Sequence, residues 1–239
     1  MNNTCKQCQA PIHENYCSKC GEPVELQRID GKYVLQEIVR VLNFDKGLLY
    51  SIRELLLRPG KSIHRFIFED RNRLVKPLVF IILTSLIYAL TERAFQFEDR
   101  YMEAGGMGDS ATAEIFGWIT ANYGYSNILM AVFIAGWIKL FFRSYKNNIF
   151  EILILLCYVM GIGMLMYAIF GIAESLSNAP ILQVGGLIGI LYTSWAIGQF
   201  FDKSKKVNYI KGLVAYILGM ISFFLVAMVL GLSIDSILS

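Results

Sequence analysis

Charged residues are scarce in this chain. Asp, Glu, Lys and Arg make up 17% of its 239 residues, against about 25% in ordinary soluble domains. Hydrophobic residues make up 55% and are gathered into long runs, which places the chain among membrane proteins. The net charge of +3 is too small to indicate a nucleic-acid-binding protein. The first residues, MNNTCKQCQA, lack a basic region followed by an apolar core, so we expect no secretory signal.

Residues that carry out chemistry are scarce as well. The chain has two histidines, His13 and His64, and both lie outside the apolar runs. The sequence contains no HExxH metalloprotease motif, no GxSxG nucleophile motif and no phosphate-binding glycine loop. Ionisable residues, which mark transport or chemistry inside a membrane, are missing from the middle of each apolar run. These absences disfavour an enzyme.

Four of the five cysteines fall within the first twenty residues, as the CxxC pairs Cys5–Cys8 and Cys17–Cys20. Two such pairs supply four thiolates, the ligand set that suits tetrahedral zinc. Because residues 1–25 are too few to fold on a hydrophobic core, metal binding would supply their folding free energy. We therefore predict a zinc ribbon over residues 1–25, with all four cysteines as zinc ligands. Iron in a four-thiolate site and a pair of redox disulfides are the alternatives.

The predicted ribbon does not by itself define a function, because such heads bind nucleic acid, bind protein or cap a terminus. Nucleic-acid binding requires several Lys or Arg side chains together with exposed aromatic residues. In this head Lys6 and Lys19 are offset by Glu14 and Glu22, so nucleic acid is not favoured. We expect a protein partner instead.

Residues 26–76 form an amphipathic region whose apolar side chains recur at helical spacing. We predict one helix over 34–42, a second that is capped by Asp45 and ends at Arg58, and a short third after Pro59. These helices are too few to enclose a core, so their apolar faces need a cover. The bilayer interface is one cover and the cytoplasmic ends of membrane spans are another. A small soluble helical domain is the third alternative.

The second half of this region is rich in Lys and Arg, whose charged ends can reach lipid headgroups while their stems cover apolar surface. We predict that the membrane-interface residues are Arg53, Arg58, Pro59, Gly60, Lys61, Arg71, Arg73, Lys76 and Pro77. We further expect the two helices that meet at Pro59-Gly60 to lie along the cytoplasmic surface. In that position they would fix the head relative to the spans.

Five apolar runs follow, each near the roughly 20 residues that a helix needs to cross a bilayer. They cover residues 77–94, 123–142, 149–173, 181–201 and 212–234, within a transmembrane domain over 77–239. The connections alternate in charge: Lys and Arg precede the first run and recur at 143–146 and 203–211, whereas acidic or uncharged segments lie between. By the positive-inside rule this alternation predicts a cytoplasmic N-terminus and an external C-terminus.

Small residues recur four positions apart in these runs. The pairs are Ala131 and Ala135, Gly185 and Gly189, Ala215 and Gly219, and Ala227 and Gly231. Such spacing lets helix backbones approach closely in lipid. It indicates packing within the bundle first, with a homo-oligomer as the alternative. The run of Gly and Met at 160–164 indicates either close packing or a turn of helix that lines a cavity.

Four features occur in order: the CxxC…CxxCG head, the segment DKGLLYSIRELLLRPGKSI at 45–63, the segment RNRLVKP at 71–77, and the multi-span tail. Together they resemble a bacterial family of uncharacterised zinc-ribbon membrane proteins, known only as a domain of unknown function. More distantly, the amphipathic lead-in with a central proline before five spans resembles the Yip family of membrane-trafficking proteins. The first resemblance implies no established activity, and the second implies membrane-shaping or protein-adaptor work.

The sequence as a whole predicts an all-α integral membrane protein of the bacterial inner membrane. It would combine a five-helix transmembrane bundle, interfacial amphipathic helices and a small N-terminal zinc ribbon. We expect a non-enzymatic scaffold or adaptor, in which the cytoplasmic metal head recruits or regulates a partner at the lipid bilayer. The alternative is a small-solute transporter or channel, which the dense glycine of the last three runs favours and the missing midplane charges disfavour.

Overall fold

The computed structural model describes residues 5, 8, 11, 17–20, 47–97, 110–177 and 179–238. The chain forms two compact units, Met1–Asn43 and Phe44–Ser239. The helix expected over 34–42, the cap at Asp45 and the head residue His13 lie outside the described residues, as does Ser239.

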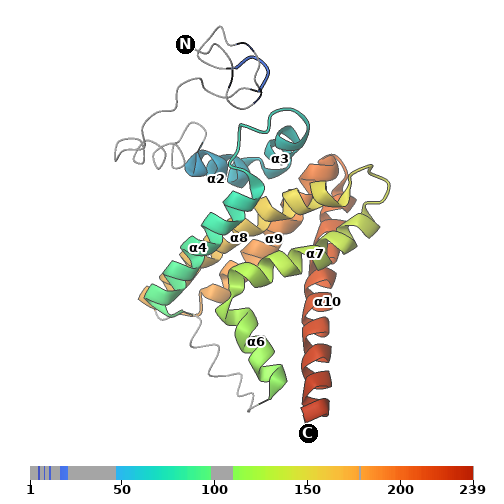
Figure 1. Ribbon diagram of the computed structural model, residues 1–239. Coiled ribbons are helices and arrows are strands. Elements are labelled where there is room, and N and C mark those ends of the chain that lie inside the picture. Colours follow the sequence, from blue (N-terminus) through green and yellow to red (C-terminus); the bar gives the residue numbers. More distant parts are fainter. Residues whose placement is uncertain are drawn as a thin grey trace. The chain divides into compact units, whose positions relative to one another are not determined.

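All the regular secondary structure in the described part of the larger unit is helical, with no strand (Figure 1). The helices are α2 (Leu48–Leu57), α3 (Pro59–Phe68), α4 (Pro77–Phe95), α6 (Ala111–Ala121), α7 (Tyr123–Phe141), α8 (Ile149–Ser177), α9 (Leu182–Asp202) and α10 (Lys206–Leu238). Five of them, α4, α7, α8, α9 and α10, are long and apolar enough to cross a membrane. The predicted all-α fold with five candidate spans is therefore confirmed, and the chain is a multi-pass membrane protein.

The start of α10 differs most from its predicted position. Residues 202–211 were expected to form a basic loop, but the turn between α9 and α10 comprises only residues 203–205. The Asp202 carboxylate closes this turn, because it accepts hydrogen bonds from the backbone N–H (3.0 Å) and the hydroxyl (2.6 Å) of Ser204. Lys206 and Lys211 consequently lie in the first turns of α10 rather than in a loop.

Helix α8 forms the centre of the bundle. It packs against α4, α7 and α9, and it also contacts α2 and α3. Its apolar residues run around the whole helix, as expected for a helix that other helices enclose. Its fully buried side chains include Leu155, Leu156, Tyr158, Val159 and Ile162.

Small residues bring α7 and α10 into close contact. A Cβ atom at Gly219 of α10 would lie 2.5 Å from the Cα atom of Ile134 on α7. Ala131, Ala135 and Ala215 are buried on the same two helices. The predicted small-residue spacing thus serves packing within one chain at this contact, because only a residue without a side chain allows so close an approach.

The short helix α6 was missed, because residues 92–122 were expected to form an external loop. Ser110 caps its N-terminus by accepting a hydrogen bond from the Ala113 amide at 3.1 Å. Asp235, near the end of α10, accepts further bonds from the Ala111 amide (2.6 Å) and the Thr112 hydroxyl (2.7 Å). These contacts hold α6 against the last turns of α10, and Figure 1 shows the two helices side by side.

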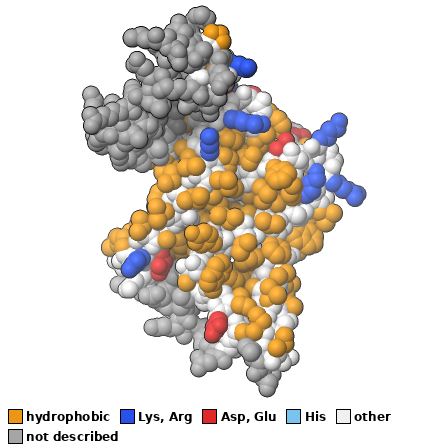
Figure 2. Space-filling model, in the orientation of Figure 1, with side chains coloured by type: hydrophobic (Ala, Val, Ile, Leu, Met, Phe, Trp, Pro, Cys, Tyr) orange, Lys and Arg blue, Asp and Glu red, His pale blue; other side chains and the backbone are white. Residues whose placement is uncertain are grey.

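Charge is unequally distributed between the two ends of the bundle. Within residues 47–238, all the described Lys and Arg residues but Arg93 belong to α2, α3, the segment before α4, or the α7–α8 and α9–α10 connections with the helix ends beside them. Figure 2 shows an apolar surface over the helices, with most of the visible Lys and Arg at the end that carries α2 and α3. This arrangement suits a protein whose middle lies in lipid.

Candidate functional site

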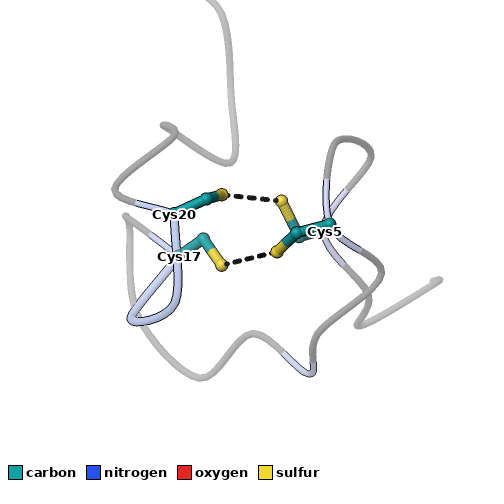
Figure 3. A group of neighbouring side chains, drawn as sticks. Cys5, Cys17 and Cys20 are labelled. Atoms are coloured by element: carbon teal, nitrogen blue, oxygen red, sulfur yellow. Dashed lines mark hydrogen bonds between the residues drawn. The ribbon is translucent and has the colours of Figure 1, made fainter.

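The four cysteines of the head come together at one point. The Sγ atoms of Cys5, Cys8, Cys17 and Cys20 all lie within 4.8 Å of one another. Two contacts, Cys5 with Cys20 and Cys8 with Cys17, measure 3.5 Å between sulfurs. Figure 3 shows the sulfurs of Cys17 and Cys20 directed across the site toward the sulfurs of the first pair.

The spacing of these sulfurs fits a tetrahedral metal site. Zinc–sulfur bonds of about 2.3 Å place neighbouring thiolates of a tetrahedron about 3.8 Å apart, and the separations here bracket that value. Cys5 and Cys17 are buried and Cys20 is exposed, so one side of the cluster is open to solvent. The four cysteines can therefore hold a metal ion.

Local backbone geometry prepares Cys17 to act as a metal ligand. Residues 18–20 form a tight turn, and the backbone amides of Cys20 and Lys19 donate hydrogen bonds to the Cys17 sulfur. These bonds stabilise the thiolate and lower the pKa of Cys17 to about 6. Because the thiolate is the form that binds metal, the turn favours coordination near neutral pH.

The second part of the candidate site is the segment of residues 47–76, called the linker below. It contains α2 and α3, which meet at Arg58 and Pro59. Arg58 has an extended φ of −147° and ends α2, and Pro59 begins α3 at its first position. Proline suits that position because its missing N–H would have no helical partner there. The predicted turn between the two helices therefore occurs at the predicted residues.

Protein covers the apolar side of the linker. Leu55 and Ile63 are fully buried, and Leu48, Phe66 and Ile67 are nearly so. Helix α2 packs on α8, and α3 packs on α9 and α8. The sequence left three alternatives for what buries these apolar side chains, and the structure shows that the ends of the membrane spans bury them. Leu49, Leu56 and Leu57 remain exposed on the opposite side of α2.

Two buried tyrosines join the spans to the linker backbone. The Tyr158 hydroxyl of α8 donates a 2.7 Å hydrogen bond to the Val75 carbonyl. The Tyr192 hydroxyl of α9 donates to the Leu55 carbonyl at 3.1 Å. Sequence reasoning missed both residues. Their signal was a tyrosine inside an apolar run, since a buried tyrosine hydroxyl usually finds a polar partner.

Serine and acidic side chains brace the linker internally. The Ser51 hydroxyl of α2 accepts a 3.0 Å hydrogen bond from the Val75 amide and donates to the Gly47 carbonyl. Glu54 accepts a bond from Ser62 of α3 at 3.3 Å and lies 3.6 Å from Arg73. Together these contacts tie α2, α3 and the segment before α4 into one piece.

The residues predicted at the membrane interface fall into two groups. Those with exposed side chains are Arg53, Arg58, Lys61, Arg71 and Lys76. The others contact protein: Pro59 and Gly60 are buried, Pro77 is half-buried at the start of α4, and Arg73 lies over the Tyr50 ring at 5.7 Å. The exposed cations are the ones that can reach lipid headgroups.

Gly60 sets the distance between α3 and α9. A Cβ atom at this position would lie 2.5 Å from the carbonyl carbon of Gln199 and 2.7 Å from the amide nitrogen of Phe200. No side chain can occupy that space unless one of the two helices moves. Gly60 therefore serves close helix packing in addition to the bend that the sequence indicated.

A cavity of about 250 Å³ lies between α7, α8, α9 and α10. Its wall contains Gly163, Gly186 and Gly189, together with polar side chains. The polar lining residues are Tyr123, Asn127, Tyr167, Thr193 and Tyr216. Met160, Gly163 and Met164 also line the cavity, which agrees with the cavity-lining interpretation of residues 160–164. Gly161, within the same run, packs closely on Phe80 and Thr84 instead.

Residues 45–89 match a family described as "Protein of unknown function (DUF3667)". The matched residues comprise the linker and most of α4, which are the elements whose contacts with α8 and α9 are described above. No curated protein and no solved structure matches the chain. The match agrees with the resemblance to an uncharacterised family over this segment, and nothing in the comparisons bears on the Yip family.

Proposed function

We propose that this chain is a non-enzymatic membrane scaffold or adaptor whose zinc-binding head recruits or regulates a protein partner. The observation that carries the proposal is the attachment of the linker to the spans through Tyr158 and Tyr192. A linker held by buried hydrogen bonds and apolar contacts moves with the bundle. A force or partner that acts on the segment leading to the head would therefore act on α8 and α9.

Zinc is the metal that we assign to the head. Four thiolates without a histidine or carboxylate form a soft ligand set, and zinc with four cysteines is a common structural site. We place the head in the cytoplasm of a bacterial cell, with the protein in the inner membrane. The gathering of Lys and Arg at the linker end of the bundle supports this orientation, because cytoplasmic ends carry the excess of positive charge.

The test of the adaptor compares wild-type protein with Cys17→Ser, using Cys157→Ser of α8 as the matched control. We expect about one zinc per wild-type chain by elemental analysis, and its loss in Cys17→Ser only. Photo-crosslinkers placed in the head should capture the same protein from native membranes with wild-type and Cys157→Ser, but not with Cys17→Ser. Equal crosslinking by all three chains, or wild-type protein without stoichiometric metal, contradicts the proposal.

The second candidate is a small-solute transporter or channel, and the cavity between α7, α8, α9 and α10 is the observation that favours it. Gly189 lines the cavity, and a Cβ atom there would meet no atom within 4 Å. Gly189→Leu should therefore fill the cavity without displacing a helix. Solute flux into proteoliposomes that Gly189→Leu abolishes would support transport. Absence of flux with the wild-type chain over a panel of small solutes would leave the adaptor as the better account.

A further inference from the structure

A pocket of about 400 Å³ lies where α3 meets the end of α9. Gly60 forms part of its wall, and Phe200, a buried aromatic residue, forms another part. The close approach of α3 to α9 at Gly60 thus places side chains of the linker beside the last turn of a membrane span. We call this site the basic pocket.

The basic pocket carries a net positive charge. Lys61 and Arg65 of α3 and Lys203 beyond α9 line it, with Glu69 as its acidic residue. Glu69 is engaged, because its carboxylate accepts a hydrogen bond from Arg65 at 3.1 Å. Within the described residues Lys61 and Lys203 have no acidic partner, since the nearby Asp202 pairs with Lys205 at 3.3 Å. Two cations are therefore left for a ligand.

We propose that the basic pocket binds the phosphate group of an anionic phospholipid. Two unpaired lysines beside an arginine form a site for a compact anion, and Gln199 adds amide donors to the wall. Basic pockets between membrane helices at the cytoplasmic side bind anionic headgroups by the same chemistry. The pocket volume is sufficient for a phosphate diester with its glycerol.

The surface beside the pocket distinguishes a lipid from a free phosphate. Leu191, Trp195 and Gln199 follow one another at four-residue spacing, so they are neighbours along α9. Leu191 is 62% exposed and Trp195 is half-buried, so this surface is open to lipid. Acyl chains can lie along it while the phosphate occupies the pocket. A soluble phosphate would make no use of this apolar strip, and tryptophan is enriched at this depth of a membrane.

The experiment measures binding of phosphatidylglycerol to the detergent-solubilised full chain by native mass spectrometry. The pocket variant is Lys61→Gln with Lys203→Gln. The matched control is Arg143→Gln with Lys146→Gln, which removes two exposed cations outside the pocket. Each lysine should contribute roughly fivefold in affinity, so the pocket variant should bind roughly 25-fold more weakly. The control should change by less than about twofold, because those cations face solvent.

Three further results decide the proposal. Lys203→Arg should keep most of the affinity, since it preserves the positive charge. That result would show that the pocket variant binds weakly because it has lost charge and not because it is misfolded. Equal weakening of the pocket and control variants would overturn the proposal, because general attraction of charge to the lipid would then explain binding. Inorganic phosphate that displaces phosphatidylglycerol at equal concentration would overturn it too, because the acyl chains would then add nothing.

Discussion

The substitution Gly60→Ala tests whether α3 is held against α9 as the structure shows. The added Cβ would lie 2.5 Å from Gln199, whereas carbon atoms in contact are normally about 3.5–4.0 Å apart. The neighbouring atoms are two backbone atoms of α9 and the Cβ atom of Gln199, none of which can turn aside, so α3 must move outward by about 1 Å. Overpacking of this kind costs about 1–3 kcal/mol, while alanine returns up to about 1 kcal/mol through its higher helix propensity. We expect a net loss of about 1–2 kcal/mol in the docking of α3.

Hydrogen exchange in lipid nanodiscs measures this loss directly. A change of 1.4 kcal/mol is tenfold in an equilibrium constant, so amides of α3 should exchange about 5- to 30-fold faster in Gly60→Ala. Gly136→Ala is the control, because a Cβ at Gly136 of α7 meets no atom within 4 Å. If α3 were not docked on α9, alanine would only strengthen the helix, and exchange would slow. Unchanged or slower exchange in Gly60→Ala would therefore refute the reasoning.

Three more predictions concern contacts elsewhere in the chain. Tyr158→Phe leaves the linker carbonyl that Tyr158 binds without its buried partner, so amides of residues 47–76 should exchange faster by an amount equivalent to about 1–3 kcal/mol. Tyr125→Phe, at an exposed tyrosine, should change nothing. Asp235→Ala removes the carboxylate that binds the first amides of α6, and exchange should rise in α6 but not in the linker. Chelation of the metal should expose the head thiols to alkylation and leave the melting temperature of the bundle unchanged, since residues 44–239 form a compact unit of their own.

The spans were predictable because their signal is local and strong. A run of about 20 apolar residues between charged segments has few other structures available to it. The boundaries of α4 and α7 agree with the expected ones to within a residue. The cysteine spacing was informative for a similar reason. Each CxxC turn directs its two sulfurs to the same side, so two such turns together can supply the four thiolates of one metal site.

The elements that bury the apolar faces of the amphipathic helices were not predictable from the periodicity of the sequence. An apolar stripe shows that one face of a helix is buried, but it does not show what buries it. The partners of α2 and α3 lie about a hundred residues or more later in the chain, on α8 and α9. Asp235 caps α6 across a separation of 124 residues, and α6 is too short to resemble a span. Contacts of this kind carry no local signal.

The difference in length between α4 and α10 has a consequence for the surrounding bilayer. The uncharged stretch of α4, Pro77 to Thr91, is about 22 Å long, and that of α10, Gly212 to Ile234, is about 35 Å long at 1.5 Å per residue. Both helices expose apolar side chains, and Figure 1 shows them on opposite sides of the bundle. A hydrocarbon core of about 30 Å is too thick for one side and too thin for the other. The bilayer must therefore become thinner beside α4. Beside α10 either the helix tilts or the bilayer becomes thicker. The protein thus imposes a gradient of bilayer thickness on the membrane around it.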